Sequence, residues 1–314
     1  MQEGAFVLID CLGFKGIWKR TDPDLLLRKF SKLGPSIQER LGHLEILFSI
    51  NGTDQLRIHN RLLSDTVAIS FQFETREGAE YSDNDRGLLV FCACLITPLV
   101  MHWFLEEEPP LVFRGCITYG KHFIENNFIA GPAIDEAAEY MNLAEGAFVW
   151  LHPSAAALYR KCLEDLSTDT RLNEETIREK IKEKEEALRS NLLMRRIVEL
   201  CGRDAIVEFF KLVLTAMRNA PFVIDPYRMP IKNGGHLECP VVNPLMSAKS
   251  VEVMRAMIEK YSAYISGDKL DIWLKRQNTI EFLREALRQF EEFEMNMRFS
   301  GVEFSELFKG FFSA

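Results

Sequence analysis

Two aspartates and one arginine stand where the chain is otherwise apolar. Asp10 ends the apolar run 6–9, and Asp65 lies in the tight connection between two strand-like segments. A carboxylate in such a place is costly unless it is paired or binds a cation. Arg114, at the start of a third strand-like segment, carries a planar guanidinium that can contact phosphate oxygens. Together these residues predict a two-metal site that faces a phosphate-binding arginine.

The chemistry of such a site indicates a nucleoside triphosphate as its ligand. Two carboxylates on neighbouring strands can hold two divalent ions against a triphosphate. Mg²⁺ suits this arrangement because it takes one or two carboxylates and completes its shell with phosphate oxygens and water. Gly13 and Phe14 follow Asp10 directly and predict a close turn into a helix. The free N–H groups of that turn can donate to phosphate oxygens.

Composition limits the classes of function. The chain has 314 residues with 46 acidic against 38 basic side chains, a net charge of −8, so a non-specific nucleic-acid binder is not expected. Seven cysteines without Cys-x-x-Cys spacing are typical of small buried side chains in a reducing compartment. The longest apolar run, 88–101, is shorter than a bilayer requires and contains Pro98. The N-terminus carries no signal-peptide pattern. These features predict a cytoplasmic protein without a membrane partner.

Hydrophobic periodicity predicts an α+β fold with one catalytic core. The predicted order is a strand, a helix, a hairpin, a helix and a strand, followed by a second hairpin, a helix and a strand, which favours a ferredoxin-like sandwich with helices on one face of an antiparallel sheet. The predicted segments are 5–10, 22–42, 56–62, 66–73, 86–104, 111–119, 121–130, 132–142 and 147–152, with a further short strand or turn at 46–50.

The whole chain is divided by composition into three predicted parts. Residues 1–153 and 219–246 form the predicted catalytic domain, with strands near 221–227 and 238–243. Residues 154–218 are a predicted helical insertion with a charge-dense middle that is typical of a solvated helix. Residues 247–314 are a predicted helical C-terminal region.

Four motifs in this order resemble the class III adenylate/guanylate cyclase homology domain. They are Asp-x-x-Gly-Phe at 10–14, the aspartate in the turn at 65, Arg-Gly-Cys-Ile-Thr-Tyr-Gly at 114–120, and Gly-Pro-Ala-Ile-Asp-Glu-Ala-Ala-Glu at 131–139. The resemblance covers roughly residues 5–152 and the later strands around 221–243. It implies a cyclase-like α/β sandwich that forms a head-to-tail homodimer with the catalytic site between subunits.

The resemblance also implies roles for individual residues. Asp10, Asp65 and the backbone carbonyl of Cys11 would bind two Mg²⁺ or Mn²⁺ ions. Gly13 and Phe14 would lie against the triphosphate. Arg114 would contact the phosphates.

Several positions depart from the family pattern. The base-reading positions fall on Arg61 and Phe128, and the transition-state asparagine and arginine fall on Asp135 and Glu139. A glutamate cannot stabilise a growing negative charge, so either another cation replaces the arginine or the domain is not a working cyclase. Lys232, in a predicted strand-edge turn, is the best candidate.

Lys121, just past the strand of Arg114, is a second candidate for the missing cation. The base-reading positions match neither purine pattern, and in this respect the chain is similar to the pyrimidine cyclases of bacterial anti-phage (Pycsar-type) signalling. Arg61 would then donate to a uracil or cytosine carbonyl, and Phe128 or Tyr140 would stack on the ring.

The predicted function is a nucleotidyl cyclase, a phosphorus–oxygen lyase that releases pyrophosphate and a 3′,5′-cyclic nucleotide such as cUMP or cCMP. A catalytically silent nucleotide-binding or scaffolding module and a palm-type polymerase remain as alternatives.

Each site residue also has a structural alternative. The two aspartates can serve turns or caps, Arg114 can pair with a neighbouring carboxylate, and Lys232 can be an exposed turn lysine. Asp135 and Glu139 can be first-turn acids that the helix dipole favours.

Overall fold

The computed structural model describes residues 1–14, 17, 21–32, 56–73, 81–106, 108–125, 128–168, 220–248, 250–265 and 269–299. The predicted element at 46–50 and most of the predicted insertion lie outside these residues. The elements in order are β1 (Gln2–Cys11), β2 (Leu56–Leu63), β3 (Thr66–Phe73), α2 (Asp83–Glu106), β4 (Phe113–Glu125), β5 (Phe128–Ala130), α3 (Pro132–Tyr140), β6 (Val149–Leu151), α4 (Pro153–Thr168), β7 (Val223–Ile231), β8 (Gly235–Val242), the 3₁₀ turn η3 (Pro244–Ser247), α9 (Val251–Tyr264) and α10 (Leu270–Phe299). Residues 23–32 are also helical.

The strands form one sheet in the order β2-β3-β1-β4-β6-β8-β7, with β5 paired to β4 outside this path. The sequence predicted an antiparallel sheet, and β1, β3 and β4 do pair antiparallel. However, β4 and β6 are parallel, with Gly115 beside Val149. The difference follows from connectivity, because α3 crosses over between β4 and β6 as in a β-α-β unit.

The sheet carries helices on both faces, not on one as predicted. Side chains alternate along a strand, so odd and even positions of β1 face opposite sides. Ala5, Val7 and Ile9 pack in the cluster that contains α2, whereas Phe6 and Leu8 pack against Ala133, Ile134 and Ala137 of α3. The crossover helix therefore covers the second face. Asp10, an even position, lies on the α3 face.

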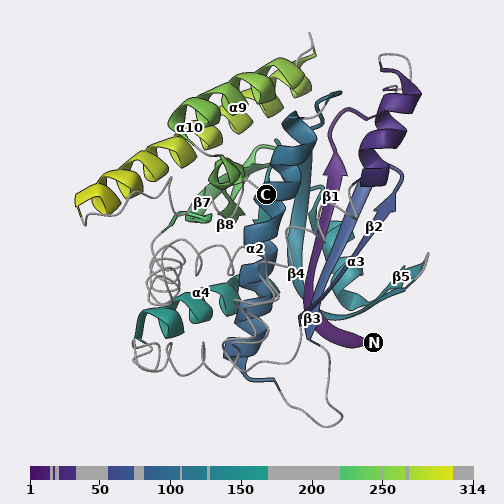
Figure 1. Ribbon diagram of the computed structural model, residues 1–314, viewed down its shortest axis with the longest axis vertical. Coiled ribbons are helices and arrows are strands. Elements are labelled where there is room, and N and C mark those ends of the chain that lie inside the picture. Colours follow the sequence, from purple (N-terminus) through teal and green to yellow (C-terminus); the bar gives the residue numbers. More distant parts are fainter. Residues whose placement is uncertain are drawn as a thin grey trace, which may run out of the picture.

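The helix α2 crosses the front of the sheet (Figure 1). The helix extends beyond both ends of the apolar run 88–101. By length and composition alone, its segment Asp85–Glu106 is long and apolar enough to span a membrane. Most of its apolar window is buried within the protein, as in a core helix. The adjacent helix at 23–32 is joined to it by Lys29, which is buried and donates to the carbonyls of Phe104 and Pro109, both at 2.6 Å. Those carbonyls lie where α2 ends, a place that favours a cation.

The strand β4 runs without a break through two segments that the sequence separated at Gly120. Gly120 pairs with Gly4 of β1, and a Cβ at this position would lie 3.4 Å from the Cβ of Ala133. The residue lies within a continuous strand beside α3, where a Cβ would make ordinary van der Waals contact, so the glycine does not mark a turn. The strand then continues into the hairpin with β5.

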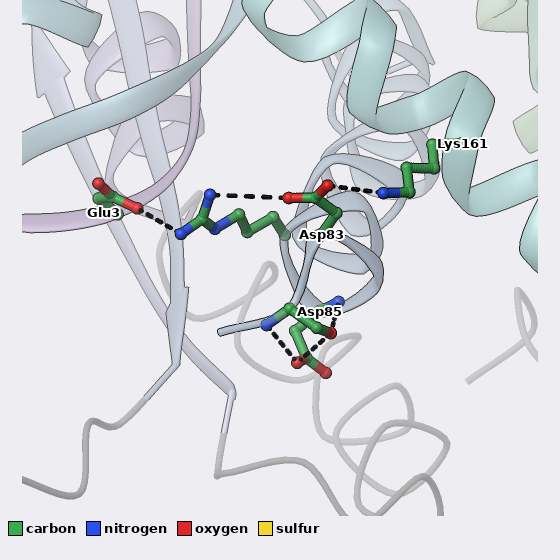
Figure 2. Close-up of polar contacts among 6 residues, drawn as sticks. Glu3, Asp83, Asp85 and Lys161 are labelled. Atoms are coloured by element: carbon green, nitrogen blue, oxygen red, sulfur yellow. Dashed lines mark hydrogen bonds and ion pairs between the residues drawn. The ribbon is translucent and has the colours of Figure 1, made fainter. Parts of the chain in front are cut away.

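The beginning of β1 is held by a chain of opposite charges. Arg86 lies 3.7 Å from both Glu3 and Asp83, and Asp83 accepts from Lys161 at 2.6 Å (Figure 2). The network links β1 to the first turn of α2 and to α4. Each carboxylate in it contacts a cation, so this end of the sheet is electrostatically matched.

The C-terminal helices α9 and α10 lie across the opposite end of the sheet, where β1 ends (Figure 1). The two helices are joined by Arg276, whose guanidinium donates to Ser262 at 2.7 and 3.0 Å. The six described cysteines are free and buried, which confirms the prediction of small buried side chains. Cys201 lies outside the described residues.

Candidate active site

Three polar side chains form a row across the sheet where β1 ends. The pairing register places Asp10 of β1 opposite Thr66 of β3 on one side and opposite Arg114 of β4 on the other. Thr66 Oγ1 donates to Asp10 Oδ1 at 3.2 Å, and Arg114 Nη2 contacts Asp10 Oδ2 at 3.4 Å. Asp10 and Arg114 are mostly buried, with 18% and 16% of their side chains exposed. The structure thus brings Asp10 and Arg114 into contact at the end of β1.

Asp65 approaches this row through a two-residue turn. Leu63 pairs with Thr66, so Ser64 and Asp65 make the whole connection between β2 and β3. Ser64 has a φ of 62°, the left-handed region that primed hairpin turns require. The carbonyl of Asp65 accepts from the N–H of Cys11 at 3.0 Å. Asp65 is therefore fixed next to the residue that follows Asp10.

The two carboxylates lie close enough to repel each other. Burial is the main cause that raises the pKa of the Asp10 carboxyl, and the charge of Asp65 raises it further. Arg114 and Thr66 act in the opposite direction, but the net shift is upward. A buried carboxyl whose pKa is raised by desolvation and by a second carboxylate is a pattern that is common at functional sites.

Further cations lie near Arg114. The turn between β7 and β8 carries Lys232, whose N–H donates to the carbonyl of Leu143 at 3.0 Å. Burial, and then the nearby charges of Arg114 and Lys275, lower the pKa of Lys232, while Glu145 opposes them. Lys232 therefore lies near Arg114, although the two residues are more than 100 positions apart in the sequence.

Arg114 retains a donor for a further contact. Its Nε is buried and has no hydrogen-bond partner among the described residues. The Asp10 contact at 3.4 Å is long for a charge-assisted hydrogen bond. The predicted alternative, an ion pair with a neighbouring carboxylate, is thus present, but it uses only part of the guanidinium.

The loop after Asp10 has a hydrogen-bonded backbone with open space beside Gly13. Gly13 has a φ of 69°, and among the described residues no heavy atom lies within 4 Å of the place a Cβ would take. Phe14 is buried and contacts Phe30 edge-on, so its ring faces the core and not a ligand. Ile17 N–H donates to the carbonyl of Phe14 at 2.8 Å. Of the predicted helix 22–42, residues 23–32 are helical and residues 33–42 lie outside the described part of the chain.

A residue from the C-terminal region also holds this loop. The Tyr264 hydroxyl of α9 donates to the carbonyl of Leu12 at 2.8 Å and lies 3.7 Å from Cys11 Sγ. Burial raises the pKa of the Cys11 thiol to about 12, so the sulfur stays protonated and only the backbone of Cys11 is suited to a hard cation.

The residues at this corner fit a divalent cation. Within the described part of the chain, no group of three or more His, Cys, Asp or Glu side chains is arranged to hold a metal by itself. Asp10 and Asp65 instead form a repelling pair, and a cation between them would relieve the repulsion that raises the pKa of Asp10. Mg²⁺ and Mn²⁺ accept this limited protein shell when phosphate oxygens complete it.

Comparisons with known proteins find similarity only at the level of solved structures. No family model and no curated protein matches the chain. Among the structures, the catalytic core of a rhodopsin-guanylyl cyclase with converted specificity, in complex with ATPαS, is 11% identical with a TM-score of 0.35 and covers 50% of this chain and 80% of that one.

The adenylyl cyclase CyaB from P. aeruginosa is 14% identical, with a TM-score of 0.33, and covers 51% of this chain and 82% of its own. The guanylyl cyclase Cya2 is also 14% identical, with a TM-score of 0.34, covering 50% and 78%. Because these TM-scores are below 0.5, the functional argument rests on the site itself.

Three residues that the resemblance assigned to the site are not brought to Asp10 within one chain. Phe128 of β5 pairs with Glu125, eleven residues along β4 from Arg114, which is roughly 36 Å at about 3.3 Å per residue. Phe128 therefore cannot contact a ligand at Asp10 of the same chain. Asp135 and Glu139 are exposed on α3, and neither is among the described groups that contact Asp10.

Arg61 lies closer to the row. It pairs with Ala68, which pairs with Leu8, so it shares the sheet face of Asp10, two strands away. Its guanidinium donates to the carbonyl of Asn60 at 2.7 Å. The second cation candidate, Lys121, pairs with Glu3 at the far end of β1 and is therefore not part of this site.

Sequence reasoning missed Thr66 and Tyr264. Thr66 was recoverable, because a hairpin turn at Ser64-Asp65 places the next residue opposite the end of β1. Tyr264 gave no local signal, since its contact depends on how α9 packs.

Proposed function

We propose that the protein is a metal-dependent nucleotidyl cyclase, which converts a nucleoside triphosphate to a 3′,5′-cyclic nucleotide and pyrophosphate. The observation that carries the proposal is the meeting of Asp10, Asp65 and Arg114 at one corner of the sheet, with Lys232 near Arg114. Two carboxylates and a group of cations in one place match a triphosphate with its counterions.

The chain's own residues suit each part of this reaction. In cyclisation the ribose 3′ oxygen bonds to the α-phosphorus, the bond to the β-phosphate oxygen breaks, and the hydroxyl proton leaves. Arg114 and Lys232 would stabilise the negative charge that grows on the departing pyrophosphate. The open backbone at Gly13 leaves room for phosphate oxygens near the N–H groups of the loop. Thr66 and Tyr264 would keep the carboxylate and the loop in place.

Asp10, Asp65 and the carbonyl of Cys11 would hold Mg²⁺ or Mn²⁺. When bound, such ions supply activation of the 3′-hydroxyl and neutralisation of the phosphates. Asp10 must be ionised to bind them, so its raised pKa predicts stronger metal binding as the pH rises through that value.

A head-to-tail homodimer would reconcile the remaining residues with this site. Phe128 is 60% exposed at the far end of the β4–β5 hairpin, and Asp135 is exposed on α3. In an antiparallel pair of subunits, the hairpin end of one chain lies near the Asp10 corner of the other. Arg61 and the partner's Phe128 would then frame the base.

We further propose UTP or CTP as the substrate and cytoplasmic anti-phage signalling as the setting. The support for this finer assignment is limited to Arg61 and Phe128 at the two base-reading positions.

The test is incubation of the purified protein with ATP, GTP, CTP and UTP separately, each with Mg²⁺ or Mn²⁺, followed by chromatography of the products. A 3′,5′-cyclic nucleotide that is absent with Asp10→Asn supports the proposal. Asp83→Asn, an aspartate in the ion-pair network at the other end of β1, is the matched control and should retain activity. Linear linked nucleotides would instead identify a polymerase-like activity.

A second candidate function is nucleotide binding without turnover. Asp135 and Glu139 favour it, because α3 presents acids where a cation is needed at the transition state. Calorimetric binding of a nucleoside triphosphate, together with no cyclic product from any of the four nucleotides, would establish the silent module and exclude the cyclase.

A further inference from the structure

The inner face of α10 extends beyond the protein core toward the proposed site. Thr279, Phe282 and Ala286 are buried at helical spacing. Phe282 packs edge-on against Phe148, with ring centroids 5.4 Å apart. The carbonyl of Phe148 accepts from the N–H of Gly115, the residue after Arg114. The buried stripe of α10 is thus anchored beside the strand that carries Arg114.

Lys275 continues this stripe by one turn. Positions 275, 279 and 282 share one helix face because they are four and three residues apart. Only 24% of the Lys275 side chain is exposed. Its carboxylate neighbour on the helix, Asp271, is 63% exposed and lies 3.9 Å away, at the limit of an ion pair. That contact alone does not account for a lysine held on the inner face.

Two hydrogen bonds fix this part of α10 against the backbone next to Lys232. Asn278 donates to the carbonyl of Glu145 at 2.8 Å, and the Thr279 hydroxyl accepts from the N–H of Ala147 at 2.9 Å. The same backbone segment pairs with the turn of Lys232, through Glu145 N–H to the carbonyl of Pro230 at 2.9 Å. This continuous set of hydrogen bonds, two made by side chains of α10 and one by the backbone, positions Lys275 near Lys232.

A second contact attaches the helical pair to the metal side of the site. Tyr264, at the end of α9, donates to the carbonyl of Leu12. The pair α9–α10 therefore touches both the loop after Asp10 and the segment that supports Lys232. A region that carries none of the cyclase motifs thus forms one wall of the site.

We infer that Lys275 is a third phosphate-binding cation of the site, which acts with Arg114 and Lys232 on the triphosphate of the substrate. This inference rests on the proposed function, since it assigns a residue to the same ligand. It also gives the C-terminal helices a role in substrate binding. The chain would in this way supply the positive charge that Glu139 cannot provide.

The test uses inorganic tripolyphosphate with Mg²⁺, a probe that requires neither the correct base nor turnover. Isothermal titration calorimetry on the full chain would compare the unaltered protein with Lys275→Gln, Lys275→Met and Lys269→Gln. We expect about a tenfold or larger rise in Kd for both Lys275 variants, the loss of one charge-assisted contact. Lys269, exposed at the start of α10, is the matched control and should leave Kd unchanged.

Three further variants separate the possible failures. Asp271→Asn removes the charge of the helical partner of Lys275. An unchanged or lower Kd for tripolyphosphate in this variant supports the phosphate role of Lys275. A rise in Kd equal to that of Lys275→Gln overturns it. An unchanged Kd for Lys275→Gln overturns the inference but leaves the proposed function standing if Arg114→Gln weakens binding. No binding by the unaltered protein overturns both, as does binding that is insensitive to Arg114→Gln and Lys232→Gln.

Discussion

The two ends of β1 carry charges of the same kinds in opposite arrangements. At Glu3, carboxylates alternate with Arg86 and Lys161, so each charge contacts an opposite one. At Asp10, a second carboxylate lies nearby, and the cations Arg114 and Lys232 lie close to each other. The first arrangement stabilises the fold modestly. The second adds a repelling carboxylate to the Asp10–Arg114 ion pair and brings Lys232 close to Arg114, a pattern that is common at functional sites.

The largest expected effect comes from Asp10→Asn. Activity should fall by at least about 10³-fold, because one of two metal ligands is lost, whereas Asp83→Asn should remain active. Cyclic product measured by chromatography, with circular dichroism for folding, checks both variants. Full activity in Asp10→Asn at saturating Mn²⁺ would contradict the proposal that activity depends on the Asp10 end of β1 and not on the Glu3 end.

Asp10→Asn should also preserve or raise the melting temperature. Burial and Asp65 raise the pKa of Asp10, so folding favours the protonated carboxyl. The stabilising contribution of this group is present below the pKa of the unfolded chain and is lost as the pH rises through the folded-state pKa. A thermal melt at neutral pH should therefore show no loss for the variant, and a marked loss would indicate a structural carboxylate.

The next largest effect is expected for Arg114→Gln. Removal of a preorganised cation should lower kcat by about 10²–10³-fold. Arg86→Gln, the corresponding change at the Glu3 end, should leave kcat unchanged. Steady-state kinetics of the two variants measures the contrast directly, and equal losses would show that both arginines act only through the fold.

Lys232 should set the alkaline limb of the pH profile. Burial and neighbouring cations lower its pKa, so it loses its charge at a lower pH than an ordinary lysine. Activity should fall as the pH rises through that value, and Lys232→Arg should move the fall to higher pH because arginine stays protonated. A pH–rate profile of both proteins gives the answer. An unshifted alkaline limb in the variant would assign it to another group.

A smaller effect is expected for Tyr264→Phe, which removes one hydrogen bond to the loop after Asp10. The Mn²⁺ concentration for half-maximal activity should rise by roughly threefold to tenfold, the cost of one neutral hydrogen bond. Tyr261→Phe, three residues earlier in the same helix, is the control for packing and should not change this value. A change in thermal stability alone would mean that Tyr264 only packs.

The smallest effect is expected for Glu3→Gln. Exposed ion pairs contribute little, so the melting temperature should change by about 2 °C or less and the activity not at all. Differential scanning calorimetry is sufficient for this comparison. A large fall in the melting temperature would show that the ion pairs at the Glu3 end contribute more to the fold than exposed pairs usually do.

Local patterns predicted most of the strands and the core helices. The continuous apolar run of β1, the hairpin around Asp65 and the apolar helix α2 were correct because burial fixes their residue types directly. The same patterns separated β4 at Gly120, where the strand in fact continues and pairs with Gly4. They also missed the parallel pairing of β6, because the direction of a short strand depends on the crossover that precedes it.

The site was predictable where strand register determines it and not elsewhere. Asp10 and Arg114 lie on neighbouring strands, so their meeting follows from the fold. Lys275 and Tyr264 come from helices whose packing has no signature in the local sequence. Phe128 was assigned by resemblance alone, and one chain places it far from Asp10.

The contact between Tyr264 and Leu12 joins residues 252 positions apart. During synthesis the N-terminal segment emerges from the ribosome first, and the loop after Asp10 waits for α9 before it acquires this hydrogen bond. A nascent chain that ends before residue 264 therefore carries every cyclase-like motif but lacks the support of its own loop.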